Sequence, residues 1–180
     1  MNSLTQFKKA AVRPLLIALM LIVGAALTPV SAIATPPCGF SSANLLFPGT
    51  QNGAFFPSGS LDLMCRSNLP DWLLNSRVRG DSDLYITQNT IQPGGQSGWH
   101  THPGPSLVTV TEGTITVYHP GCTVETYSVG QTFADLGCGD IHNVVNETGA
   151  EAKNIAVQIV PHGAPRRIDE PDQGCVPLCP

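Results

Sequence analysis

The stretch Gly98-Trp99-His100-Thr101-His102-Pro103-Gly104-Pro105 places two histidines two residues apart, among short segments that are typical of β-strands. Side chains at positions i and i+2 of a strand point to the same face, so we expect His100 and His102 to converge on one point. A third histidine, His142, follows forty residues after His102 and stands shortly before an apolar pair. Three imidazoles that meet leave coordination positions of a metal ion open, as catalytic metal sites require.

Seven short segments between residues 83 and 160 have the composition of β-strands. They are 84–91, 107–111, 114–118, 124–128, 131–134, 141–145 and 155–160. Turns rich in Gly and Asn separate them, and short strands at regular spacing indicate a sandwich or a barrel. We therefore predict an all-β domain over 83–160, an irregular N-terminal arm over 35–82 and a loop-like C-terminal tail over 161–180.

The last of these segments alternates in character from residue to residue. Ile155, Val157 and Ile159 fall on one face of the predicted strand, and Ala156 and Gln158 fall on the other.

The first 34 residues have the pattern of a cleaved export signal. Positive residues precede an apolar run over 15–30, and small residues then supply a cleavage site. The positive residues are Lys8, Lys9 and Arg13, and the small ones are Ala32 and Ala34. The apolar run is short for the roughly 20 residues that cross a bilayer, although an uncleaved membrane anchor is the alternative. We predict a signal peptide over 1–34, a secreted or periplasmic location, and no stable membrane insertion after cleavage.

The net negative charge of the chain limits which classes of partner it can bind. The 180-residue chain has a formal net charge of −4, and cleavage would leave six Lys and Arg against thirteen Asp and Glu, a net charge of −7. The sequence has no basic stripe and no interleaving of Arg with aromatic residues. We therefore expect no nucleic-acid partner. The predicted mature chain, of about 146 residues, suits one domain with a sizeable core.

All six cysteines follow the predicted signal peptide. They are Cys38, Cys65, Cys122, Cys138, Cys175 and Cys179. An even number of cysteines in an exported chain predicts disulfide bonds. We favour a Cys122–Cys138 bond because the two residues flank a predicted hairpin, with Cys38 and Cys65 fastening the arm and a Cys175–Cys179 staple in the tail. The alternative is a thiolate metal site that includes Cys138 near His142.

The chain resembles the cupin superfamily, whose members are small β-barrels of the jelly-roll type. The first cupin motif is matched by Gly94, His100, His102 and Gly113, and the second by Gly130, Gly139, His142 and Asn146. Gly137 stands where the second motif has a proline, and the spacing from Gly130 is one residue longer than usual. The resemblance covers about residues 83–160. It implies a metal ion held by His100, His102 and His142.

One departure from the cupin pattern bears on the metal. The position of the family's glutamate ligand falls on Ser106, which is a poor ligand for a divalent ion. Glu112 does not replace it, because it lies in the hairpin turn. Asp140 is a candidate, since it precedes His142 by two residues and shares its face if the strand begins there. Three imidazoles and water would keep the full +2 charge of the ion, which favours a small anionic substrate.

Several functions stay open. A divalent ion bound by three histidines resembles the site of dioxygenase-like cupins, in which the ion polarises a substrate or activates dioxygen. Fe, Zn, Mn, Cu and Ni all accept imidazole ligands. The alternatives are a non-catalytic cupin that binds a small molecule or sugar in the barrel mouth, and a structural or interaction protein at the cell surface. The sequence assigns no catalytic base or nucleophile, and a homodimer also stays open because cupins often pair.

Overall fold

The computed structural model describes residues 33–177, and among these residues every regular element is a β-strand. The strands are β1 (Cys38–Asn44), β2 (Ala54–Phe56), β3 (Leu63–Arg66), β4 (Leu73–Ser76), β5 (Ser82–Gln96), β6 (His100–Thr101), β7 (Ser106–Glu112), β8 (Thr114–Tyr118), β9 (Val124–Ser128), β10 (Thr132–Asp135), β11 (Asn143–Val145), β12 (Ala152–Pro161) and β13 (Ile168–Asp169). The predicted signal peptide lies almost wholly outside the described residues. Within them no helix has the length and apolar character needed to cross a membrane.

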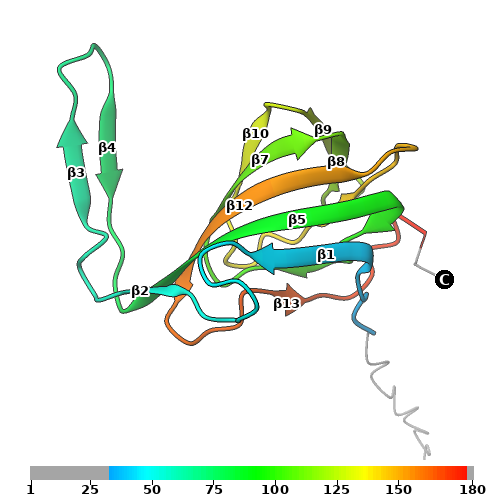
Figure 1. Cartoon of the computed structure of the whole chain (residues 1–180), viewed down its shortest axis with the longest axis horizontal. Helices are drawn as coiled ribbons and strands as arrows, with labels where there is room; N and C mark the ends of the chain where they lie inside the picture. The colour runs from blue at the N-terminus through cyan, green and yellow to red at the C-terminus, as the bar shows by residue number, and fades with distance from the viewer. Residues whose placement is uncertain (1–32, 178–180) are drawn as a thin grey trace, which may run out of the picture. The chain divides into compact units, whose positions relative to one another are not determined.

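A single nine-stranded sheet curls into a nearly closed barrel around the long strand β5. Along β5, one edge pairs with β12 and the other with β1 and β2, as Figure 1 shows for β12, β5 and β1. Beyond β12 the sheet continues through β7 to β10. At the far end of β5, Gln96 pairs with Val145 of β11, which leads on to β8 and β9.

The barrel interior is apolar at one end. Inward side chains from five strands of the sheet form one buried cluster there, against which Phe40, Tyr127 and Phe133 pack. The cluster consists of Ile91, Val110, Ile115, Val117, Val144 and Ala152. Because members from β5, β7 and β12 touch members from β8 and β11, the sheet must fold back on itself. β-branched side chains suit such a pleated, buried surface.

The structure confirms the expected all-β barrel. All seven predicted strands form, and they correspond in order to β5, β7, β8, β9, β10, β11 and β12. Strand β9 has the predicted bounds of 124–128. Strand β5 extends further than expected, from Ser82 to Gln96. The tail holds one short strand, β13, which pairs with β6.

The arm over 35–82 is more regular than its composition indicated. Strands β1 and β2 extend the barrel sheet by pairing with β5, and β3 and β4 form a separate two-stranded hairpin. The segment is poor in alternating apolar residues because β1 is mostly Gly, Ser and Asn, with Phe40 as its one large apolar side chain. Backbone hydrogen bonds to the edge of β5 therefore stabilise β1 and β2 as strands, although their side-chain pattern does not predict them.

The predicted disulfide pairing is wrong. Cys122, in the turn between β8 and β9, bonds to Cys175 in the tail, which excludes both the Cys122–Cys138 bond and the Cys175–Cys179 staple. Cys138 and Cys65 are free and exposed, so Cys65 does not fasten the arm, whereas Cys38 is disulfide-bonded. The backbone N–H of Cys138 instead donates to the carbonyl of His102, 2.6 Å away, which holds the loop after β10 beside the histidine segment.

Candidate metal centre

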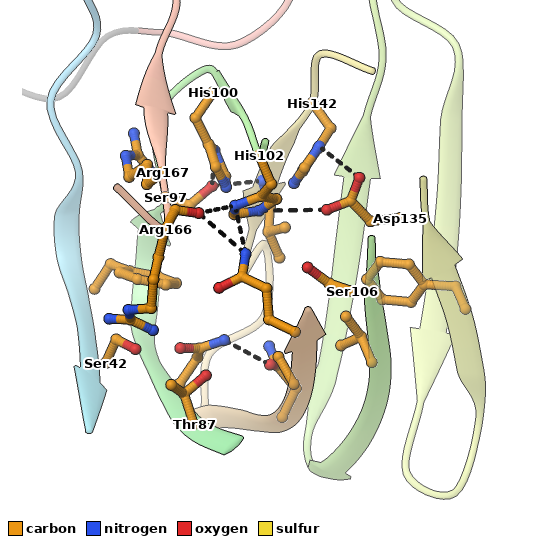
Figure 2. A pocket seen from close by; sticks show the side chains of 18 residues that line it. Ser42, Thr87, Ser97, His100, His102, Ser106, Asp135, His142, Arg166 and Arg167 are labelled. Atoms are coloured by element: carbon orange, nitrogen blue, oxygen red, sulfur yellow. Dashed lines mark hydrogen bonds and ion pairs between the residues drawn. The ribbon is translucent and has the colours of Figure 1, made fainter. Parts of the chain in front are cut away.

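The structure brings His100, His102 and His142 together at the end of the barrel opposite the apolar cluster. His100 begins β6, and an isolated antiparallel bridge joins it to His142, with each backbone N–H 2.9 Å from the other residue's carbonyl oxygen. His102 lies two residues further along and presents its ring to the same point, as Figure 2 shows. One nitrogen from each ring lies within 4.8 Å of the other two.

A backbone carbonyl faces the Nδ1 atom of each ring. The Nδ1–H of His100 donates to the Gly98 carbonyl at 2.8 Å, and that of His102 donates to the Arg166 carbonyl at 2.6 Å. The Asp140 carbonyl lies 3.4 Å from Nδ1 of His142. A carbonyl beside Nδ1 favours the tautomer with its proton on Nδ1 and its lone pair on Nε2, whereas at His102 the Gln158 side-chain amide nitrogen also lies 2.8 Å from Nδ1. This is the outer hydrogen bonding that orients histidine ligands in metal sites.

Burial keeps the three imidazoles neutral. It is the largest cause that lowers the pKa of His100 well below 6.5, and the neighbouring charges of His142 and Arg167 lower it further. Burial also lowers the pKa of His102 and of His142, against the opposing effects of the Arg166 carbonyl on the first and Asp135 on the second. A divalent ion binds the neutral form of histidine, so the cluster has the protonation state that metal binding needs.

Asp135 is a member of this site that the sequence did not reveal. It ends β10, is 6% exposed, and places its Oδ2 atom 3.3 Å from Nε2 of His102. Its Oδ1 atom lies 3.9 Å from Nδ1 of His142 and accepts a hydrogen bond from the Gly137 backbone N–H at 2.8 Å. Neither Asp135 nor the sequence candidate, Asp140, belongs to the group of residues whose ligand atoms all lie within 4.8 Å of one another, and Asp140 faces His142 through its backbone carbonyl.

A row of three inward polar residues crosses the sheet beside the histidines. Asp135 on β10 pairs in register with Ser106 on β7, and Ser106 pairs with Gln158 on β12. Ser106 occupies the position that the cupin motif gives to glutamate, and it is 3% exposed. Among the described residues, neither its Oγ atom nor Oδ2 of Asp135 has a hydrogen-bond partner.

A cavity of about 120 Å³ opens in front of the histidines. Figure 2 shows Asp135 and Ser106 on one side of it and Arg166 and Arg167 on the other. The Gln158 amide donates to the Arg166 carbonyl at 3.0 Å, so the tail is fastened to the cavity wall. Such a cavity has room for an ion and a small ligand and not for a polymer.

Comparison with known proteins finds structural neighbours only. No family model and no curated protein matches the chain. An uncharacterized conserved protein with a double-stranded β-helix domain from Klebsiella pneumoniae is 19% identical, and the match covers 50% of this chain and 76% of that one at a TM-score of 0.44. A cupin domain from Bordetella pertussis is 19% identical, with 62% and 98% coverage and a TM-score of 0.38.

The polyketide cyclase RemF from Streptomyces resistomycificus is 18% identical, with 51% and 65% coverage and a TM-score of 0.42. These identities and TM-scores are low, so the neighbours support no statement about ligand or activity. The strand order and the meeting of both histidine motifs at one end of the barrel are properties of this chain itself. Both agree with the small β-barrel that the resemblance to the cupin superfamily implied.

Proposed function

We propose that this protein is an exported cupin that binds one divalent metal ion through His100, His102 and His142 and accepts a small anionic ligand at the open positions of that ion. The observation that carries the proposal is the meeting of three imidazoles, of which His100 and His142 are buried and His102 is partly buried, each with a backbone carbonyl facing its Nδ1 atom. Imidazole nitrogens that carry a lone pair and converge on one point are the ligands that a divalent cation needs.

Two arginines favour a negatively charged ligand. The side chains of Arg166 and Arg167 line the cavity on the side opposite Asp135 and Ser106. Arg167 forms an ion pair with Asp169 through Nε, whereas its buried Nη2 atom has no hydrogen-bond partner among the described residues. A guanidinium N–H left free in a cavity is a site for a carboxylate or a similar anion. An anion held between Arg167 and the ion would be oriented at both ends.

The bound ion would act as a Lewis acid or activate dioxygen, which makes a dioxygenase-like enzyme our working hypothesis. The residues of this chain would then hold the ion, orient the anionic end of the substrate through Arg167 and keep bulk water from the buried histidines. The disulfide between Cys122 and Cys175 supports export, because such bonds persist in oxidising compartments.

The first experiment measures bound metal. The full chain is expressed with export to an oxidising compartment, purified, and examined by elemental analysis beside the His100→Ala/His142→Ala variant. We expect about one equivalent of a divalent metal in the unmodified protein and a loss of that metal in the variant, because two of three ligands are removed. His119→Ala is the matched control, since His119 is a histidine outside the cluster.

Absence of metal after reconstitution with Fe(II), Zn, Mn, Cu and Ni would contradict the proposal. Retention of the metal by the double variant would contradict the ligand assignment. If a small carboxylate binds equally well before and after treatment with a chelator, the site is that of a non-catalytic binding protein.

A further inference from the structure

We propose that Asp135 is the fourth protein ligand of the metal ion, and that it supplies from β10 the carboxylate that the cupin motif places at residue 106. This inference rests on the proposed metal site. It changes the expected ligand set from three histidines to three histidines and one carboxylate.

Strand pairing places Asp135 at the right level of the barrel. Asp135 and Ser106 are directly opposite each other on β10 and β7, and both are buried. Opposite residues of an antiparallel pair project to the same face of the sheet with neighbouring Cβ atoms. A carboxylate on β10 therefore reaches the space that a side chain at residue 106 would fill. The separation of 3.3 Å between Oδ2 of Asp135 and Nε2 of His102 shows that it does so.

One carboxylate oxygen of Asp135 is held by a hydrogen bond, and the other is available to bind a metal ion. Oδ1 accepts the hydrogen bond from Gly137, which holds the carboxylate plane in place. Oδ2 is buried and has no hydrogen-bond partner within the part of the chain that the structure describes. Gly137 is needed for this arrangement, because its φ is +62° and an added Cβ would lie 2.2 Å from the Gly104 carbonyl oxygen. Gly137, which stands where the motif has a proline, thus helps to orient the carboxylate of Asp135.

Asp135 is buried, and its ion-pair contacts within the described residues are to His102 at 3.3 Å and to His142 at 3.9 Å. A buried carboxylate is costly unless it is paired, hydrogen-bonded or coordinates a metal. A divalent ion held by the three histidines and by Oδ2 of Asp135 would give that oxygen atom a partner.

The ligand set affects what the site can bind. With Asp135 bound, an octahedral ion has two open positions, which suits a small bidentate anion or an anion and one further small molecule. The net charge at the ion is then +1, and Arg167 adds the second positive charge that an anion meets in the cavity. The sequence alone had implied an ion that keeps its full +2 charge.

Titration with Co(II) on the full chain, exported and first freed of metal with a chelator, tests this inference. Binding is followed by visible absorption and by competition with a chromophoric chelator, for the unmodified protein, Asp135→Asn and Asp71→Asn. We expect Asp135→Asn to weaken Co(II) binding at least about tenfold and to change the absorption spectrum, because the amide is a poorer ligand than the carboxylate. Asp71→Asn, which makes the same change at an exposed position in the turn of the β3–β4 hairpin, should change neither property.

The outcomes separate this inference from the proposed function. Unchanged affinity and spectrum in Asp135→Asn, with Co(II) bound by the unmodified protein, would overturn the role of Asp135 and leave the three-histidine site standing. Failure of the unmodified protein to bind Co(II), Zn or Fe(II) would overturn both.

Thermal unfolding in excess chelator checks that the variant keeps its fold. Asp135→Asn should then be at least as stable as the unmodified protein, because it lacks a buried unpaired charge. Lower stability of the variant in chelator, together with unaltered Co(II) absorption, would show that Asp135 has a structural role and would overturn the proposal.

Discussion

The backbone of Gly98 sets where the histidines after it can lie. Its φ is +71°, and an added Cβ would lie 2.2 Å from the Thr35 carbonyl oxygen. Its own carbonyl accepts the hydrogen bond from Nδ1 of His100, and the Thr35 hydroxyl lies 2.6 Å from the N–H of Trp99. The first described residues of the arm are therefore packed directly against the start of the histidine segment, and only glycine fits there.

Replacement of Gly98 by alanine should destabilise the protein by about 2–4 kcal/mol, because it adds a collision with fixed backbone to the strain of a left-handed conformation. Gly94→Ala is a matched control, since Gly94 has the same φ of +71° but nothing within 4 Å of an added Cβ. That control should cost only about 1 kcal/mol, from backbone strain alone. Urea unfolding measures both, and equal losses in the two variants would show that the contact with Thr35 is unimportant.

At the residue scale, the sequence revealed the histidines and not the aspartate. His100 and His102 are recognisable because a spacing of two places them on one face of a strand whatever surrounds them. Asp135 is the last residue of β10, one of the ordinary strands, and carries no local signal. It reaches the site because β10 pairs with β7 in one particular register, and a single sequence does not give that register.

Strand β12 shows how the interior of the barrel overrides a local pattern. Its larger apolar side chains, Ile155, Val157 and Ile159, are only half-buried, whereas Asn154 and Gln158 on the other face are buried. The inner face is polar here because it borders the cavity, where Asn154 accepts a hydrogen bond from Asn89 at 2.9 Å. The two faces were predictable from the alternation, but the alternation did not show which face points inward.

The carboxylate of Asp83, at the start of β5, binds the loop that follows β12. Oδ1 of Asp83 lies 2.9 Å from Nδ1 of His162, and its Oδ2 accepts from the Gly163 N–H at 2.9 Å. Burial by itself raises the pKa of Asp83, but these two hydrogen bonds and the charge of His162 outweigh burial and hold the pKa below 3.8. A carboxylate with a lowered folded pKa stabilises the protein above its unfolded pKa, and that stability is lost as the pH falls through the folded value.

Asp83→Asn should therefore be less stable than the unmodified protein by about 1 kcal/mol near pH 5, and the difference should shrink as the pH falls below about 3.8. Urea unfolding at several pH values measures this difference. Asp71→Asn, at an exposed position in the turn of the β3–β4 hairpin, is the control and should show no such trend. A constant difference for Asp83→Asn at all pH values would contradict an ionic contribution.

In the whole molecule, the tail completes the end of the barrel that holds the three histidines. Strand β13 pairs with β6, with Asp169 opposite His100, and the preceding segment supplies the Arg166 carbonyl that faces His102. The disulfide between Cys122 and Cys175 fastens the end of this tail to the turn between β8 and β9. A loop-like tail was expected, yet its residues form part of the wall of the site.

Removal of this disulfide by Cys122→Ser/Cys175→Ser should destabilise the protein by up to about 4 kcal/mol, because the bond closes a loop between residues 53 positions apart. Urea unfolding under non-reducing conditions measures the loss. Cys65→Ser is the control, since Cys65 is free and exposed, and should change stability by no more than about 0.5 kcal/mol. A double variant as stable as this control would show that packing and strand pairing alone hold the tail.

The sequence by itself determined the all-β class, the seven barrel strands and the three histidines that meet. These depend on composition, on residue spacing within one strand and on the order of two motifs along the chain, all of which are local properties. The tertiary structure alone decided the presence of Asp135, the partner of Cys122, the inward face of β12 and the contribution of the tail. Each of these depends on which distant segments lie side by side and in what register, and packing of the whole barrel settles that.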